Sequence, residues 1–282
     1  MSKATAALAA AILASLGISA QAQDRFAAET ATIAEVHKAL AAGQITCRGL
    51  VQAYLDRIAA YDQAGPKIDA IRAINRNALK QADAIDQARG EFASRPLACA
   101  PLVLKDNYNT AEMPTTGGSA SLEGAQPTED APVIARLRKA GAIILAKANM
   151  QEFALGGTSI SSLGGQVLNP YDLTRTPGGS SGGTGAAVAS GMALAGTGSD
   201  TVNSIRSPAS ANNLVGLRTS QGLISLDGIM PVSKTQDAIG PITRTVADAA
   251  AMLQVMADPD KVKGDYTADL RSAPSRAPAS AW

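Results

Sequence analysis

The fold is decided by Pro101-Leu-Val-Leu104, a short apolar run that ends at Lys105-Asp106-Asn107. A second apolar run, Ala142-Ile-Ile-Leu-Ala146, follows the helical pattern of residues 133–140. Continuous apolar runs of this length are typical of strands that are buried on both faces. Buried strands that alternate with helices favour an α/β sheet over a sandwich or a helical bundle. The sequence therefore predicts an α/β fold.

The residues before this sheet have helical signals. Thr32-x-x-Glu35 is a capping box, and the apolar residues after it have helical spacing. Thr46 can cap a second helix, and residues 73–87 are rich in good helix formers. We therefore expect only helices up to residue 90, and further short helices over residues 183–190 and 246–257.

The composition excludes several classes of partner. The chain has 282 residues, with 25 Lys and Arg against 24 Asp and Glu, and 46% of its residues are hydrophobic. A hydrophobic content this high is typical of a folded protein. A net charge of +1 without a basic run lacks the positive patch that nucleic acid or an anionic membrane surface would attract. We expect neither of these partners.

The first residues have the pattern of a secretory signal peptide. Lys3 precedes an uncharged run from Ala4 to Ala20, and Ala20-Gln21-Ala22 fits a cleavage site. The alternative is an ordinary N-terminal helix, whereas a membrane-spanning helix needs about 20 apolar residues. We expect residues 1–22 to be removed and the mature chain to be exported to a bacterial periplasm, without stable membrane insertion.

Cys47 and Cys99 are the two cysteines of the chain. In an oxidising compartment they can form a single disulfide. The alternative is two buried free thiols, because sequence alone does not show whether the Cα atoms lie within the ~7 Å that a bridge requires. Both alternatives stay open.

The only histidine, His37, lies between Ile33 and Leu40 on the apolar stripe of its helix. An imidazole at such a position is usually a packed residue, so we expect a catalytic base other than histidine. One histidine and two separated cysteines also lack the ligand spacing of a zinc site. We expect no metal.

Two serine-containing stretches remain as candidates for chemistry. The first is Gly178-Gly-Ser-Ser-Gly-Gly183, which lacks the lysine of a phosphate-binding loop. The second runs from Gly198 to Arg206, and its Ser204 is flanked by Asp200 and Arg206. Gly196-Thr-Gly198 also lacks the third glycine of a dinucleotide motif, so we expect no nucleotide or other cofactor.

Together with Lys105 in Val-Leu-Lys-Asp-Asn, these stretches resemble the amidase signature family of serine hydrolases. Lys105 precedes Ser180 by 75 residues and Ser180 precedes Ser204 by 24, and both spacings agree with that family. Further matching motifs, in the family's order, are Thr115-Thr116-x-Gly118-Ser119, Lys147-Ala-Asn149-Met150-x-Glu152-Phe153, Asn169-Pro170, Gly216-Leu217-Arg218 and Gly240-Pro241-Ile-Thr-Arg244-Thr.

The resemblance implies a mixed central sheet covered by helices on both faces, and hydrolysis of a small-molecule carboxylic amide through an acyl-serine. Ser204 would be the nucleophile and Ser180 the bridging serine, placed by a cis peptide with Gly179. Lys105 would be the base, which requires a neutral amine. Lowering a lysine pKa from about 10.4 to near 7.5 costs about 4 kcal/mol. The alternative is that Lys105 merely pairs with Asp106.

The resemblance also assigns the loop that would receive the oxyanion. Its donors would be the backbone N–H groups of Thr201, Val202, Asn203 and Ser204. Many members of the family have Gly-Gly where this chain has Val202-Asn203. A β-branched residue cannot take a positive φ cheaply, so either this loop has ordinary φ angles or Val202 is strained.

Three further residues match a hydrogen-bonded cluster that fixes both loops in the family. They are Ser181, Asp200 and Arg206. The alternative is an ordinary surface ion pair between Asp200 and Arg206.

The chain is shorter than the catalytic domains of this family. We assign residues 23–265 to an incomplete amidase domain and residues 266–282 to a disordered tail. We expect an unpaired sheet edge, exposed apolar helix faces, and a sequence that is a fragment or a frameshifted product. A truncated, inactive remnant is therefore the alternative to an active amidase. The signal peptide argues against a glutamine-dependent amidotransferase subunit, whose work is cytosolic.

Overall fold

The computed structural model describes residues 26–271, apart from the side chains of Arg89, Phe92 and Arg271. The expected signal peptide and residues 272–282 lie outside this range. The described helices are α2 Ile33–Ala41, α3 Cys47–Tyr61, α4 Ala78–Gln87, α5 Arg89–Phe92, α6 Pro132–Lys139, α7 Gly182–Ala189, α8 Arg206–Ala211 and α9 Val246–Met256, with 3-10 helices η1 Ala120–Leu122, η2 Glu152–Ala154 and η3 Ala268–Arg271. The strands are β1 Ile71–Ile74, β2 Pro101–Lys105, β3 Ile143–Ala148, β4 Ile160–Ser161, β5 Gly165–Gln166, β6 Ala195–Asp200, β7 Val215–Gly216 and β8 Ala238–Thr243.

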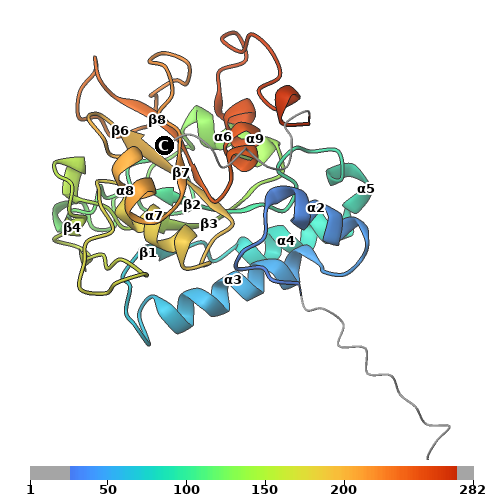
Figure 1. Cartoon of the computed structure of the whole chain (residues 1–282), viewed down its shortest axis with the longest axis horizontal. Helices are drawn as coiled ribbons and strands as arrows, with labels where there is room; N and C mark the ends of the chain where they lie inside the picture. Colours follow the sequence, from blue (N-terminus) through green and yellow to red (C-terminus); the bar gives the residue numbers. More distant parts are fainter. Residues whose placement is uncertain (1–25, 272–282) are drawn as a thin grey trace, which may run out of the picture.

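A mixed sheet in the order β1-β3-β2-β6-β8-β7 forms the centre of the molecule (Figure 1). β2 pairs in parallel with β3 on one side and with β6 on the other, whereas the remaining pairs are antiparallel. Crossovers between parallel strands are right-handed. The connection through α6 runs from β2 to β3, whereas the connection through α7 runs in the opposite direction along the sheet, from β3 past β2 to β6. The two helices α6 and α7 therefore lie on opposite faces. α9 packs beside α6, and α7 contacts β2, β3, β6 and β8. The predicted mixed sheet with helices on both faces is confirmed.

The helices before β2 are only partly as predicted. The capping box is present, because the Thr32 hydroxyl accepts from the Glu35 N–H while the Glu35 carboxylate accepts from the Thr32 N–H. Thr46 caps α3 in the same way, through the N–H of Gly49. The helix predicted from residue 73 begins only at Ala78, because Ile71–Ile74 pairs antiparallel with β3 as strand β1. Pairing with the sheet overrides the weak local helix propensity.

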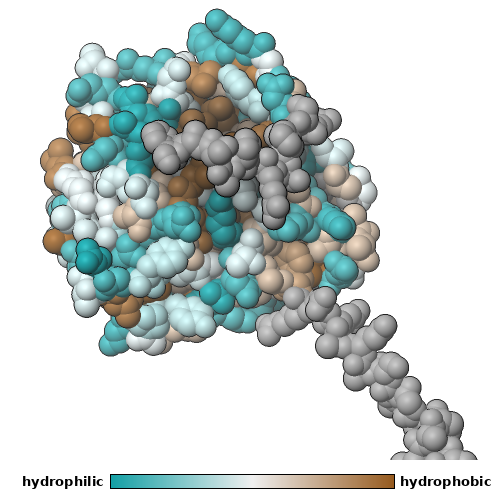
Figure 2. Space-filling view, in the orientation of Figure 1, coloured by the Kyte–Doolittle hydropathy of each residue, from teal (hydrophilic) through white to brown (hydrophobic). Residues whose placement is uncertain are grey.

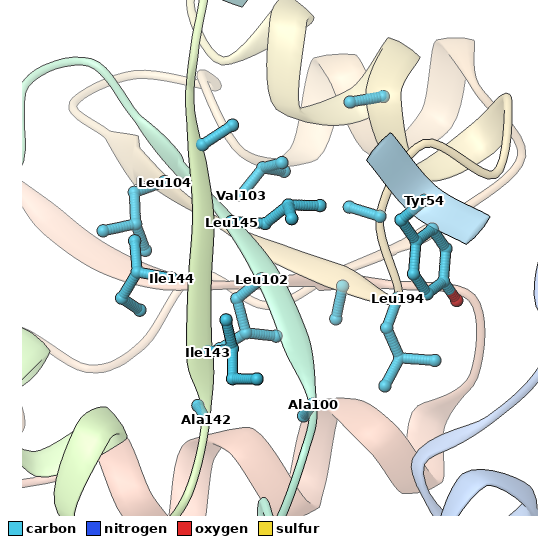
Figure 3. Close-up of a cluster of buried hydrophobic side chains, with 14 of the residues drawn as sticks. Tyr54, Ala100, Leu102, Val103, Leu104, Ala142, Ile143, Ile144, Leu145 and Leu194 are labelled. Carbon is cyan, nitrogen blue, oxygen red and sulfur yellow. The ribbon is translucent and has the colours of Figure 1, made fainter. Parts of the chain in front are cut away.

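The two runs that decided the fold are buried at every position of β2 and β3. Figure 3 shows Leu104 and Ile144 on one side of these strands, and Val103 and Leu145 on the other, toward Tyr54 of α3. Each strand therefore contributes to the core on both faces, which explains why its sequence is continuously apolar instead of alternating.

Cys47 and Cys99 form a disulfide, which decides between the two alternatives. Their Cα atoms are 5.7 Å apart, and both residues are fully buried. The bond joins the first residue of α3 to the segment that leads into β2, so it ties the helical N-terminal part to the sheet.

Residues 266–271, the described part of the segment expected to be a disordered tail, contain ordered structure. They include η3, and the N–H of Tyr266 donates to Gln254 Oε1 at 2.8 Å.

Apolar side chains are exposed at Val246 (61%) and Val202 (71%). Figure 2 shows hydrophobic residues gathered in the upper part of one face, among hydrophilic ones. Among residues 26–271, no helix has the length and apolar content needed to span a membrane.

Candidate active site

The candidate residues meet at the carboxyl ends of two neighbouring strands in the middle of the sheet. Lys105 is the last residue of β2 and Asp200 is the last residue of β6. Because these two strands are parallel neighbours, their carboxyl ends lie side by side. Ser180 and Ser181 directly precede α7, which packs on the same two strands. The sheet thus brings together three stretches that are far apart in the sequence.

The Lys105 amine lies among hydroxyl and carbonyl oxygens, and its side chain is fully buried. Its Nζ is 2.6 Å from Ser180 Oγ, 2.8 Å from Ser199 Oγ and 3.3 Å from the carbonyl oxygen of Ser199. Burial lowers the pKa of Lys105 to about 7, although the charges of Asp200 and Asp237 oppose this shift. Burial therefore favours the neutral form of this amine.

Asp106 does not pair with Lys105. Leu104 and Lys105 of β2 point to opposite faces of the sheet, and Asp106, which follows the strand, lies on the Leu104 side. There it forms an ion pair with Lys147 of β3, at 2.9 Å between Nζ and Oδ1. Lys147 lies beside Leu104 in the parallel register, hence on that opposite face. The alternative in which Lys105 is merely the partner of Asp106 is wrong.

Ser180 is held in a tightly packed loop. A cis peptide bond joins it to Gly179, as the resemblance implied. A Cβ at Gly179 would lie 2.8 Å from the carbonyl carbon of Gly157, so a larger residue does not fit there. The N–H of Ser181 donates to the carbonyl oxygen of Ser204 at 3.2 Å. This bond joins the Ser180 loop to the Ser204 loop.

The segment from Thr201 to Ser204 forms a bend between β6 and α8. Ser204 is 7% exposed, whereas Val202 is 71% exposed. Neither Val202 nor Asn203 has a positive φ, so this loop has ordinary φ angles and Val202 is not strained. Within residues 26–271, Ser204 accepts a hydrogen bond through its backbone carbonyl oxygen, from the Ser181 N–H, and its hydroxyl makes none.

Asp200 is the buried centre of a hydrogen-bonded cluster. Its carboxylate accepts from the Ile205 N–H at 3.0 Å and forms ion pairs with Arg206 and Arg218, each at 3.2 Å. Burial tends to raise the pKa of Asp200, but the bonds from Arg206 and Ile205 outweigh it and hold that pKa below its usual value. Because the carboxylate is fully buried, the alternative of an ordinary surface ion pair is wrong.

Ser181 is the remaining residue expected in this cluster. Its hydroxyl donates to the carbonyl oxygen of Ser199 at 3.3 Å and not to the Asp200 carboxylate. It therefore joins the Ser180 loop to β6 through the residue before Asp200.

Sequence reasoning missed four residues of this site. Ser199 contacts Lys105 and also accepts from Asn107 Nδ2 at 3.0 Å. Arg218 pairs with Asp200, and Asp237 accepts from the Thr201 hydroxyl at 2.6 Å. Ser199, Asn107 and Arg218 each lie inside a motif quoted above, but the motifs did not indicate what these three residues do. Asp237 lies three residues before the motif that begins at Gly240, and no sequence pattern pointed to it.

Other candidate features lie elsewhere. His37 Nε2 is 3.1 Å from the Ala98 carbonyl oxygen, and burial lowers the pKa of its ring, which confirms a packed histidine. A cavity of ≈ 1140 Å³ is lined by residues 26–29 and by α3 with the residues before it, and no candidate residue lines it. In the described part of the chain, no group of three or more His, Cys, Asp and Glu could hold a metal ion.

Known proteins are similar to most of this chain. The model of the Amidase family matches residues 49–279. A glutamyl-tRNA(Gln) amidotransferase subunit of Maridesulfovibrio salexigens is 44% identical over 231 residues, which cover 82% of this chain and 47% of that protein. The chain spans about half the length of the curated relatives it matches.

Solved structures are also similar to most of this chain. The native peptide amidase of Stenotrophomonas maltophilia is 43% identical, with a TM-score of 0.78 over 87% of this chain and 51% of that chain. An amidase family protein from Bacillus anthracis is 36% identical, with a TM-score of 0.82 over 85% of this chain and 51% of that chain.

Proposed function

The chain belongs to the amidase family, and we propose that it hydrolyses a carboxylic amide to an acid and ammonia or an amine. The observation that carries the proposal is the 2.6 Å distance between the buried amine of Lys105 and the Ser180 hydroxyl. A serine hydroxyl is inert until a neighbouring base takes its proton, and this pair supplies that base.

The surroundings of Lys105 favour its neutral form. A neutral amine has two N–H donors and one lone pair. The two oxygen atoms of Ser199 can accept both donors, which leaves the lone pair for the Ser180 O–H. Since the pKa of Lys105 is about 7, neutralising it at neutral pH costs little.

The proposed reaction begins with two proton transfers. Lys105 Nζ takes the Ser180 proton while Ser180 Oγ takes the Ser204 proton. Ser204 Oγ attacks the amide carbonyl carbon and forms a tetrahedral oxyanion. Collapse of this intermediate breaks the C–N bond, the leaving nitrogen takes a proton back through Ser180, and the acyl group stays on Ser204. Water then attacks the acyl carbon while one of its protons passes through Ser180 to Lys105, the bond to Ser204 Oγ breaks, and Ser204 regains that proton as the acid leaves.

The oxyanion is proposed to bind to the backbone N–H groups of Thr201, Val202, Asn203 and Ser204. Loss of one such donor typically costs about 100- to 1,000-fold in rate. The pairing of Asp200 with Arg206 supports the loop, because Arg206 also donates to the carbonyl oxygen of Val202. Preorganised donors stabilise a transition state without moving during the reaction.

The proposed substrate is a small-molecule amide. Among the relatives, one solved structure is called a peptide amidase, and several curated proteins are called subunits of a glutamyl-tRNA(Gln) amidotransferase. A hydrolase of free amides is favoured here over a component of an amidotransferase, on the strength of the leader pattern at residues 1–22.

The mature protein is further proposed to work in the bacterial periplasm. The disulfide between Cys47 and Cys99 supports this location, because structural disulfides persist in oxidising compartments and are rare in the cytosol. Intact mass of the protein from a periplasmic extract tests it. A chain that begins at Gln23 and carries the disulfide is expected, and a full-length chain retained in the cytoplasm would contradict export.

A fluorophosphonate probe tests the catalytic proposal. The whole chain is incubated with the probe, whose phosphorus is attacked by an activated serine with loss of fluoride, and the adduct is located by peptide mass. Labelling at Ser204 is expected, with loss of the adduct in Ser204→Ala and no change in the control Ser210→Ala, an exposed serine of α8. A folded chain that is not labelled would be an inactive member of the family.

A further inference from the structure

A segment that lies outside the proposed catalytic residues is tied to the site at two points. We call residues 230–236 the strap. At its start, the N–H of Met230 donates to the carbonyl oxygen of Asn107 at 2.8 Å, two residues after Lys105. Asn107 Nδ2 in turn donates to the Met230 carbonyl oxygen at 3.4 Å and to Ser199 Oγ at 3.0 Å. The strap is therefore attached to the side of the site that holds the base.

The second attachment is made by the carboxylate of Asp237, which directly follows the strap and is 7% exposed. One oxygen, Oδ2, accepts from the N–H groups of Val232 and Ser233 at 2.8 and 3.0 Å. The other oxygen, Oδ1, accepts from the Thr201 hydroxyl at 2.6 Å. A single carboxylate thus joins the strap to the first residue of the loop that ends at Ser204.

We propose that Asp237 is a positioning residue, which fixes the loop from Thr201 to Ser204 against the strap and adds a negative charge that acts on Lys105. This inference rests on the proposed function for its second part only. The positional part depends on three hydrogen bonds to one buried side chain. Hydrogen bonds to charged groups are stronger than neutral ones, so a carboxylate at this point holds both segments more firmly than an amide would.

The charged groups around Lys105 set the sign of the electrostatic effect. Asp200 at the end of β6 and Asp237 before β8 both raise the pKa of Lys105 against the effect of burial. Asp200 is partly compensated by Arg206 and Arg218. The opposite face of the sheet holds the Asp106–Lys147 pair, and α7 begins with uncharged residues.

Two substitutions separate position from charge. Thr201→Val removes the hydroxyl that reaches Asp237 and keeps both the shape and the charges. Asp237→Asn removes the charge, and the amide can keep the geometry, because its oxygen accepts from Val232 and Ser233 while its NH₂ donates to the Thr201 oxygen. Thr235→Val is the matched control, since Thr235 is exposed and its hydroxyl contacts Ser233 within the strap.

Hydrogen exchange of the whole chain tests the positional part without any need for activity. In Thr201→Val, the amides of residues 201–204 and 230–236 are expected to exchange about tenfold faster than in the wild type, whereas Thr235→Val leaves residues 201–204 unchanged. Equal exchange in Thr201→Val and the wild type would overturn the positional role. If exchange changes but the wild type is not labelled by fluorophosphonate, the proposed function fails and the positional role stands.

The labelling rate at Ser204, measured against pH, tests the electrostatic part. Loss of the negative charge in Asp237→Asn lowers the Lys105 pKa, so the midpoint of the rise in rate is expected to move down by about 0.5 to 1 pH unit. Thr201→Val is expected to lower the rate about tenfold without moving the midpoint. A midpoint in Asp237→Asn that stays in place or moves upward would overturn this part.

Discussion

Two buried lysines on neighbouring strands have different surroundings. Lys105 of β2 and Lys147 of β3 are both fully buried, and their side chains point to opposite faces of the same sheet. Lys147 donates to the Pro114 carbonyl oxygen at 2.9 Å and to Thr115 Oγ1 at 2.8 Å, and forms an ion pair with Asp106. Lys105 instead meets uncharged oxygens of Ser180 and Ser199.

The difference shows which of the two buried lysines is suited to act as a base. Burial lowers the pKa of both amines, but a carboxylate in contact stabilises the protonated form of Lys147. Near Lys105 the carboxylates of Asp200 and Asp237 act from outside the hydrogen-bond shell, and its pKa falls to about 7. Lys147 is thus suited to hold structure, whereas Lys105 is suited to exchange a proton. The predictions below test this contrast.

Lys105→Met is expected to have the largest effect on chemistry. Removal of the proposed base should slow fluorophosphonate labelling of Ser204 by about 100- to 10,000-fold. The folded state should be no less stable, because the substitution removes the cost of burying an amine. Labelling kinetics and a denaturant titration of the same sample measure both effects. Labelling at the wild-type rate would remove Lys105 from the reaction.

Lys147→Met is expected to affect stability instead. It leaves the carboxylate of Asp106 buried without its partner, which typically costs about 3 to 5 kcal/mol in the free energy of unfolding. Adding Asp106→Asn should recover part of this loss, because the unpaired charge is removed. Denaturant titrations of the single and double variants measure it. A Lys147→Met variant as stable as the wild type would show that the Asp106–Lys147 ion pair does not stabilise the folded state.

The pH dependence of the wild type should reflect Lys105 alone. The proposed base would act only when neutral, so the labelling rate should fall about tenfold per pH unit below a midpoint near 7 and level off above it. The folded pKa lies below the ordinary lysine value of 10.5, so the unfolded chain binds more protons between these values. Stability should therefore rise with pH over that interval, and Lys105→Met should lose the part of this rise that Lys105 contributes, while buried Lys147, whose pKa is also lowered, keeps its own part. A flat rate between pH 6 and 8 would contradict the assignment.

His37→Ala should have the smallest effect. The imidazole contacts the Ala98 carbonyl oxygen in the helical N-terminal part and lies outside the site. Its removal should lower the free energy of unfolding by about 1 kcal/mol and leave the labelling rate unchanged. A large loss of labelling in a folded variant would make a histidine part of the chemistry after all.

Much of the fold could be predicted from local sequence. The runs at residues 101–104 and 142–146 predicted strands in the right places, and Thr32 and Thr46 marked the starts of two helices. Strand β1 was missed, because Ile71–Ile74 is only four residues long and is followed by good helix formers. A strand this short is defined by its partner in the sheet, which local sequence does not contain.

The site was predicted less completely, for a related reason. Lys105, Ser180 and Ser204 could be singled out because each stands in a motif of characteristic spacing. Ser199 contacts Lys105 only because β6 lies beside β2, and Asp237 reaches Thr201 only because β8 lies beside β6. Such neighbours follow from the order of strands in the sheet, which no local pattern records.

The sequence by itself determined the α/β class, the family and the residues that carry its motifs, because these depend on hydrophobic periodicity and on residue types at fixed spacings. Only the tertiary structure decided the pairing of Cys47 with Cys99 and which lysine meets Asp106. Both depend on distances and side-chain directions between segments far apart in the chain. Alternation along β2 sends Leu104 and Lys105 to opposite faces, and the register with β3 places Lys147 beside Leu104, where it pairs with Asp106 just after the strand.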